Sequence, residues 1–378
     1  MDKLMQNFQF KTSYLAHIVT IGIATFLIYS NTYAVPFYFD DITSIINSAQ
    51  TYQGDLSDIY NQFGNRFVAY ASFQLNYKLD GLNLWGFHLT NIIVHLLASL
   101  SVYLLALQLF IITSRIQKQD PINKDIQYIF AFITALLFAV HPLQIQAVAY
   151  IVQRTTALAA LFYISTMVSY IQFRTSKSAL IKVLMIVLTL LFLLLAFYTK
   201  QNTYTLPGAL VLIEFIFIYQ LSERNYKDLL KPGIFFVVFC VLGLIYVLLF
   251  KQTIITLLFA GSRETPDFSR IVYFETQLGV LALYLKLYLL NIGQQFEYVY
   301  TLEDGKLINS LGYILSYIAL IGFAFWQIKR NAILAFAIIF YFLAHIIESA
   351  VIPISDIVFE HRTYLPHLGL SLIVAFLL

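Results

Sequence analysis

Charge and cysteine are both scarce in this chain of 378 residues. Only 11% of the residues are charged, whereas soluble proteins carry about a quarter, and 60% are hydrophobic. The single cysteine, Cys240, lies within an apolar stretch, so neither an intrachain disulfide nor a cysteine-based metal site can form. The sequence also lacks a glycine-rich phosphate loop, a tandem repeat and a basic face suited to nucleic acid. These absences argue against a soluble enzyme, a nucleotide-binding site and a nucleic-acid partner.

Long apolar runs make up most of the chain. Segments of about 17 to 25 apolar residues cross the hydrocarbon core of a bilayer as helices. The first run has no small-residue cleavage site, so we interpret it as an anchor helix rather than a removed signal peptide. The composition predicts an all-α, multi-pass membrane protein forming one domain over residues 1–378. The segments are 13–36, 89–112, 127–141, 151–173, 179–198, 203–220, 232–250, 271–291, 309–328, 332–348 and 363–378.

Basic residues gather in alternate loops, and this pattern orients the chain. Loops rich in Lys and Arg stay on the cytoplasmic side of a membrane. The segments 37–88, 142–153, 199–202 and 349–362 are therefore predicted to share the extracytoplasmic face. The cytoplasmic clusters are Lys3 and Lys11; Arg115, Lys118 and Lys124; Arg174, Lys177 and Lys182; Arg224, Lys227 and Lys231; and Lys329 and Arg330.

One segment breaks this alternation. If 232–250 leaves the cytoplasm, 271–291 starts outside, yet the basic pair at 329–330 requires 309–328 to start outside as well. Either 271–291 is re-entrant or interfacial, or a further crossing lies within 251–262. The sequence leaves both alternatives open.

The first long polar loop, 37–88, begins with the paired carboxylates Asp40 and Asp41 directly after the first apolar run. Carboxylates cannot stay in hydrocarbon, so the pair marks a membrane surface. The aromatic pattern around Tyr60 and Tyr70 predicts short amphipathic helices that lie in the interface and form the wall of a cavity. The alternative is an ordinary solvated loop.

Two corners place further polar groups on the same face. Proline removes a helical hydrogen bond and favours a helix boundary before it, so the run 127–173 should break at His141-Pro142. Near this break lie His141, Gln144, Gln146, Gln153 and Arg154, and the second corner, 198–202, carries Lys200.

Several motifs, taken in order, resemble those of the GT-C superfamily of membrane glycosyltransferases. The resemblance is strongest to the transmembrane and tetratricopeptide-repeat O-mannosyltransferases and their bacterial relatives, and it covers nearly the whole chain. The motifs are Phe39-Asp40-Asp41 with Asn47; Asn76 to Asn83, followed by Gly86 to Asn91 and His95; His141-Pro142 with Gln144 and Ala147 to Arg154; Thr199-Lys200 with Leu206-Pro207; and Glu348 together with Glu360 to Pro366.

Gln201 and Gln146 stand where that family usually has acidic residues, and the sequence contains no tetratricopeptide repeat. We expect an acceptor-binding module to be missing or to follow Leu378. The resemblance implies a GT-C-like bundle of about 10 to 11 helical segments with a large first extracytoplasmic loop. It also implies a mannosyltransferase-like activity in protein glycosylation.

A site on the outer face has no nucleotide sugar available, so a sugar donor has to arrive on lipid. A polyprenyl-phosphate sugar fits this requirement, and the expected acceptor is a hydroxyl of a protein Ser or Thr or of a glycan. Asp40 is the candidate general base. One base without a nucleophilic carboxylate suits an inverting reaction. Asp41 is a second catalytic candidate, which would orient the acceptor or Asp40; alternatively, both carboxylates only cap the first span.

Four cationic groups are candidates for binding the donor phosphate, because guanidinium and ammonium groups stabilise charge on its oxygens. We expect Asp40, Arg154 and Arg362 to line one cavity. Alternatively, these cations form salt bridges with Glu348, Asp356 or Glu360 that only join helices. The phosphate-binding candidates are Arg154, Lys200, His361 and Arg362, and the other substrate-binding candidates are Arg66, His88, His141, Gln144 and Glu360.

Other functions are compatible with parts of this pattern. A transporter or lipid flippase places polar groups near the bilayer midplane in repeated halves, and neither feature is present here. A ligase or oligosaccharyltransferase that uses a pyrophosphate-linked lipid is a closer alternative, as is a non-catalytic binder. A divalent metal is not expected. If the donor were a pyrophosphate-linked lipid that required a metal ion, Asp40, Asp41 and Glu360 would be the candidate ligands of that ion.

Overall fold

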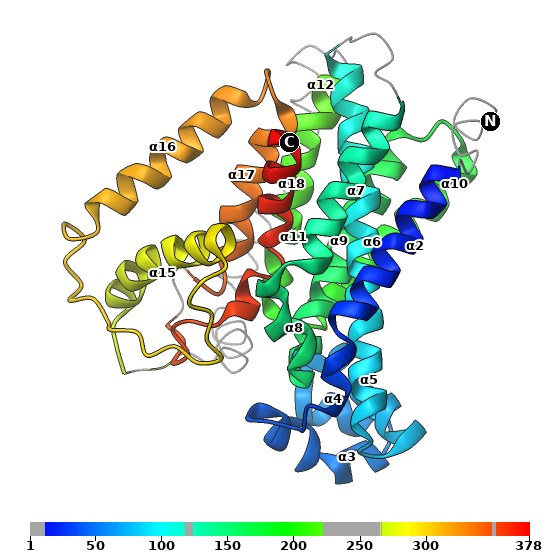
Figure 1. Ribbon diagram of the computed structural model, residues 1–378, viewed down its shortest axis with the longest axis vertical. Helices are drawn as coiled ribbons and strands as arrows, with labels where there is room; N and C mark the ends of the chain where they lie inside the picture. Colours follow the sequence, from blue (N-terminus) through cyan, green and yellow to red (C-terminus); the bar gives the residue numbers. More distant parts are fainter. Residues whose placement is uncertain (1–11, 118–123, 222–264, 266, 350–352) are drawn as a thin grey trace, which may run out of the picture.

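The structure is a computed structural model that describes residues 12–117, 124–221, 265, 267–349 and 353–378 (Figure 1). Every element in this part of the chain is helical. The predicted segment 232–250 and the possible crossing within 251–262 lie outside the described residues.

Most of the helices run alongside one another in an upright bundle (Figure 1). Their sequences are nearly continuous runs of apolar residues, and polar caps mark where some of them begin. The Asn83 side chain accepts a hydrogen bond from Trp85 N at 3.1 Å, and Ser178 accepts one from Ile181 N at 3.5 Å. The bundle consists of α2 (Thr12–Ile28), α6 (Leu84–Ile116), α7 (Lys124–Val140), α9 (Arg154–Thr175), α10 (Ala179–Phe197), α11 (Leu206–Ile213), α12 (Tyr219–Leu221), α17 (Ala332–His345) and α18 (His367–Leu377).

Among the described residues, five helices are long and apolar enough to cross a membrane, and a sixth span is counted if a bent pair forms one crossing. Three further apolar helices, α16 (Leu311–Gln327), α17 and α18, are shorter, at 10 to 17 residues. These findings confirm the prediction of an all-α protein with several candidate membrane spans. The boundaries of 151–173 and 179–198 are reproduced to within a few residues.

The predicted break at His141-Pro142 is present. Helix α7 ends at Val140, and the chain continues through η5 (Pro142–Gln144) into α8 (Ile145–Ala149) at an angle of 54°. The backbone of His141 is extended, and its ring nitrogen Nδ1 accepts a hydrogen bond from Leu143 N at 3.3 Å. A short turn, η6 (Ile151–Gln153), then leads into α9.

The first loop folds into short helices at one end of the bundle, as predicted (Figure 1). Asp55 and Asp58 form a reciprocal capping box at the start of the longer of the two helices that precede α5. The helices pack through aromatic rings, including Phe63 stacked on Tyr70 with ring centroids 3.6 Å apart. The turn η2 (Ser30–Ala34) precedes the loop, whose elements are η3 (Ile42–Ile46), α3 (Ala49–Gln53), α4 (Leu56–Phe63), η4 (Gly64–Arg66) and α5 (Phe67–Asp80).

Helix α15 (Arg270–Leu290) lies crosswise to the upright helices, and α16 extends away from the bundle beside it (Figure 1). Among the described residues, α15 is not one of the helices that are long and apolar enough to cross a membrane. Its buried face carries Tyr273, Glu275 and Tyr284. This placement favours the re-entrant or interfacial alternative for 271–291. The remaining turns are η7 (Gln201–Thr205), η8 (Glu214–Ile218) and η9 (Glu360–Thr363).

Candidate functional site

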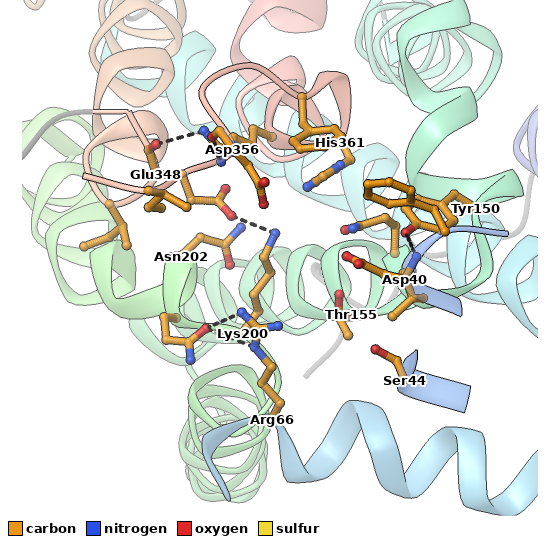
Figure 2. Close-up of a pocket in the computed structure, with 18 of the residues that line it drawn as sticks. Asp40, Ser44, Arg66, Tyr150, Thr155, Lys200, Asn202, Glu348, Asp356 and His361 are labelled. Atoms are coloured by element: carbon orange, nitrogen blue, oxygen red, sulfur yellow. Dashed lines mark hydrogen bonds and ion pairs between the residues drawn. The ribbon is translucent and has the colours of Figure 1, made fainter. Parts of the chain in front are cut away.

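Segments that are far apart in the sequence meet around a cavity of about 360 Å³ (Figure 2). The first loop contributes Asp40 and Arg66. The segments at the two predicted corners contribute Tyr150, Val152, Gln153 and Thr155 from the first and Lys200, Gln201, Asn202 and Tyr204 from the second. The C-terminal loop closes the opposite wall with Ile354, Asp356, Phe359, His361 and Arg362. The loops and corners that were predicted to share one face therefore converge on one site.

Asp40 lines this cavity, and its buried neighbour Asp41 anchors the turn that carries it. Asp41 is 1% exposed, and its carboxylate accepts hydrogen bonds from Val152 N at 2.7 Å and Tyr38 N at 3.2 Å. The backbone N–H of Asp40 donates to the Tyr150 hydroxyl at 2.7 Å. These bonds fix the turn, so the Asp40 side chain is held at the cavity (Figure 2).

Asp41 does not line the main cavity, which corrects its predicted place beside the reacting groups. Burial raises the pKa of the Asp41 carboxyl to about 6, although the backbone N–H groups of Val152 and Tyr38 act in the opposite direction. Its carboxylate is bonded to the backbone N–H groups of Tyr38 and Val152, which hold the turn that carries Asp40. The role of orienting Asp40, one of the two predicted for it, stays a prediction.

Lys200 brings a buried cation to the cavity. Its Nζ lies 2.7 Å from Glu348 Oε1 and donates to Thr156 Oγ1 at 2.9 Å. Burial raises the pKa of Glu348, but the charges of Lys200 and Arg362 outweigh it and hold this pKa below its ordinary value. The predicted alternative of a helix-joining salt bridge is therefore present, and it lies within the cavity wall (Figure 2).

Arg362 and His361 lie side by side in the C-terminal loop, and both line the cavity. The Arg362 guanidinium donates to the backbone oxygens of Ile357 at 3.2 Å and Glu348 at 3.4 Å, and also to that of Asp356. The backbone N–H of His361 donates to Gln146 Oε1 at 2.7 Å. Arg362 thus shapes the loop while its charge stays at the cavity.

Arg66 is a further predicted cation in the cavity wall. Its Nε and Nη2 donate to Gln201 Oε1 at 3.4 and 3.3 Å (Figure 2). The amide that replaces the expected acidic residue after Lys200 therefore contacts Arg66. Five predicted site residues thus meet at one cavity: Asp40, Arg66, Lys200, His361 and Arg362.

Arg154 does not line the cavity, so the expectation that it shares the site with Asp40 and Arg362 is wrong. It is fully buried, and its guanidinium donates to Asn91 Oδ1 and Asn76 Oδ1, both at 2.6 Å. It also donates to the carbonyls of Ser72 and Phe87. The side chain points from the start of α9 toward α5 and α6, and it joins those helices.

His88, His141 and Gln144 were predicted to bind substrate, but none of them lines the cavity. His88 Nε2 pairs with Val35 O at 2.8 Å, and His141 Nε2 pairs with Tyr288 O at 3.1 Å. Gln144 is fully buried. All three lie in the packed interior, His88 on α6 and the other two at the break after α7.

Glu360 lies apart from the main cavity and lines a second one, of about 330 Å³, together with Asp41. Its Oε1 accepts hydrogen bonds from the Tyr298 hydroxyl and from Gln295 N. Burial raises the pKa of the Glu360 carboxyl. Tyr150 borders both cavities.

Sequence reasoning missed some of the cavity wall. Tyr150 stands within the motif Ala147 to Arg154 but was not singled out, since aromatic residues are frequent throughout the chain. Glu348 and Asp356 were considered only as salt-bridge partners, yet both line the cavity. Among the described residues, no group of three or more His, Cys, Asp or Glu side chains is arranged to hold a metal ion.

Sequence comparisons connect the chain with protein O-mannosyl-transferases. It is 31% identical to mouse TMTC1 over 162 residues, which is 39% of this chain and 16% of the relative. It is 28% identical to human TMTC3 over 214 residues, or 53% of this chain and 21% of the relative. Human TMTC2 is 29% identical over 170 residues, or 40% and 18%.

The chain thus spans about a fifth of the length of these curated relatives. No protein-family model matches it, and no solved structure matches it. The similarity to several TMTC proteins confirms the resemblance that the ordered motifs indicated. Over about 39% to 53% of its length, the chain is therefore similar to the TMTC protein O-mannosyl-transferases.

Proposed function

We propose that this chain is a membrane glycosyltransferase that transfers a mannose-like sugar from a polyprenyl-phosphate donor to a hydroxyl group of a protein. The reaction takes place on the extracytoplasmic face and inverts the anomeric centre. The names of the relatives support protein O-mannosylation as the class of reaction. The donor, the stereochemistry and the face are parts of the proposal.

The observation that carries the proposal is the meeting of Asp40 with Lys200 and Arg362 around one cavity. Sugar transfer from a lipid phosphate needs a base for the acceptor proton and cations for the leaving phosphate. These groups act on opposite sides of the same anomeric carbon. A carboxylate and two buried cations from distant segments supply both requirements.

Each group then has a definite task. Asp40 accepts the proton of the acceptor hydroxyl as that oxygen bonds to the anomeric carbon. The bond from this carbon to the phosphate oxygen breaks, and the lipid phosphate leaves with the electron pair. Lys200, His361 and Arg362 stabilise the charge on the phosphate. Displacement by a single base, with no enzyme nucleophile, gives inversion.

The place of the cavity in the fold suits a lipid-borne donor. Its wall combines residues of the first loop with residues at the ends of the upright helices. The short helices of the first loop lie at one end of the bundle (Figure 1). An isoprenoid chain can therefore lie along apolar helices while its phosphate is at the cavity. Transporters place their polar groups near the bilayer midplane instead, in broken helices. The site thus supports transfer better than transport.

The test is transfer of mannose from polyprenyl-phosphate mannose to a Ser- and Thr-containing peptide by the purified chain in lipid nanodiscs. Asp40→Asn keeps the size of the side chain but removes its basicity, so turnover should fall about a hundredfold or more. Arg362→Lys keeps the charge but loses the planar fork, so the KM for the donor should rise while the protein stays folded.

Asp80→Asn is the matched control, because Asp80 is exposed at the end of α5 and lies outside the cavity. We expect it to retain full activity. More than a tenth of wild-type turnover in Asp40→Asn would refute the assignment of the base. Transfer should continue after chelation of divalent ions, whereas loss of transfer on chelation would favour a pyrophosphate-linked donor.

A further inference from the structure

The second cavity differs from the first in its charge. The main cavity has Arg66, Lys200 and Arg362 in its wall, together with carboxylates. The second cavity is lined by two acidic residues, Asp41 and Glu360, and by no lysine, arginine or histidine of the described chain. A phosphate therefore finds cationic side chains in the first cavity and only carboxyl groups as charged partners in the second.

Aromatic and amide groups complete the second cavity. Tyr38, Tyr150 and Phe296 form a wall in which the Phe296 ring lies 4.8 Å from that of Tyr38 and 5.2 Å from that of Tyr150, between centroids. Gln294 lines the cavity, and its buried Nε2 has no hydrogen-bond partner in the described structure. Apolar walls with a few polar groups, one of them an unused donor, are typical of ligand sites.

The two cavities adjoin each other at the turn that carries Asp40 and Asp41. Asp40 lines the first cavity and Asp41 the second, while Tyr150 borders both. The Tyr150 hydroxyl accepts a hydrogen bond from Asp40 N. A chain that occupies the second cavity therefore lies beside the base without entering the phosphate site.

We propose that the second cavity binds the acceptor peptide, and that Glu360 gives it a preference for basic residues near the modified hydroxyl. This inference rests on the proposed function and assigns the acceptor side of that site. An extended peptide offers amide groups to the glutamines and apolar surface to the aromatic wall. A lysine near its Ser or Thr gains attraction to Glu360, whereas a glutamate there is repelled.

The experiment compares two peptides that differ only in a Lys or a Glu next to the acceptor Thr, with the full chain in nanodiscs. We expect the KM of the Lys peptide to be lower by roughly threefold to fivefold, as for a partly screened ion pair. Glu360→Gln should abolish this preference and leave the KM for the donor unchanged. An unchanged peptide preference in Glu360→Gln would overturn the proposal.

A second variant guards against misfolding of Glu360→Gln. Ile145 lines the cavity and is 53% exposed, so Ile145→Lys places a positive charge at its edge without disturbing the core. It should reverse the preference toward the Glu peptide. Leu79→Lys is the control, because Leu79 is 73% exposed on α5 and outside both cavities, and it should change nothing.

Equilibrium binding of the same peptides to Asp40→Asn separates this inference from the proposed function. A preference for the Lys peptide that Ile145→Lys reverses would support the acceptor site even if no transfer occurs. If transfer occurs but the two peptides behave alike, the acceptor site is wrong and the proposed function stands. A shift in donor KM with Ile145→Lys would instead place the lipid chain in this cavity and overturn the proposal.

Discussion

At the residue scale, two adjacent carboxylates have different surroundings. Asp40 lines the main cavity, whereas Asp41 is buried and accepts hydrogen bonds from the backbone N–H groups of Tyr38 and Val152. Burial favours the neutral form of a carboxylic acid, and this effect exceeds that of the backbone donors. The pair therefore combines a candidate base with a positioning residue.

The raised pKa of Asp41, about 6, predicts how stability changes with pH. Between about pH 4 and pH 6 the folded chain holds a proton at Asp41 that the unfolded chain has lost, so this contribution to stability falls as the pH rises. Asp41→Asn lacks this titration. Measured by thermal unfolding in detergent, the Tm of wild type relative to Asp41→Asn should therefore decrease between pH 4 and pH 7. A relative Tm that increases would mean that the backbone donors dominate.

Because Arg154 is buried and lies outside the cavity, we expect its replacement to reduce stability rather than donor binding. Arg154→Met would leave the side-chain amide oxygens of Asn76 and Asn91 without their hydrogen bonds to the guanidinium. The free energy of unfolding should fall by roughly 3 kcal/mol or more, because buried acceptors would lose hydrogen bonds to a charged donor. Arg115→Met, at an exposed site near the end of α6, is the control and should unfold like wild type. A stable Arg154→Met protein that fails to bind donor would restore the original assignment.

At the element scale, the packing of α17 against α18 depends on a glycine, Gly369, which has no side chain to separate the two helices. A Cβ atom built on Gly369 would lie 2.6 Å from Ala337 O and 3.4 Å from Tyr341 N. Both neighbours are backbone atoms of α17, so the helices could accept the atom only by moving apart. Small residues at such contacts allow membrane helices to approach closely.

Gly369→Ala should therefore destabilise the protein by about 1 to 3 kcal/mol, as overpacking does elsewhere. Gly322→Ala on α16 is the matched control, since no atom lies within 4 Å of a Cβ built there. It should be neutral or slightly stabilising, because alanine favours a helix over glycine. Thermal unfolding of the two variants side by side measures the difference. Equal Tm values would show that α17 and α18 separate without cost.

At the scale of the whole molecule, the first loop and the C-terminal loop meet at one cavity. If that end of the bundle is extracytoplasmic, single cysteines at Ser57 and Ser355, in a chain with Cys240→Ala, should both react with an impermeant thiol reagent in intact cells. Both serines are exposed. A cysteine at the exposed Lys177, in a predicted cytoplasmic loop, should react only after permeabilisation. Labelling of only one of the two serine positions would contradict the arrangement.

The sequence by itself determined the elements and their order. Apolar length predicts the spans, Pro142 predicts the break after α7, and polar residues at helix ends predict which loops gather around Asp40. These are local properties, since a proline or a charge acts on its own turn or on its own place relative to hydrocarbon.

Only the tertiary structure decided which of the charged residues reach the cavity. Lys200 follows the end of an apolar segment and Arg154 lies at the start of one, yet Lys200 lines the cavity and Arg154 is buried among α5, α6 and α9. The crosswise path of α15 and the separation of Asp41 from Asp40 were settled in the same way. The physical reason is that the direction of a side chain depends on how its helix is rotated and packed against others, and those neighbours are distant in sequence.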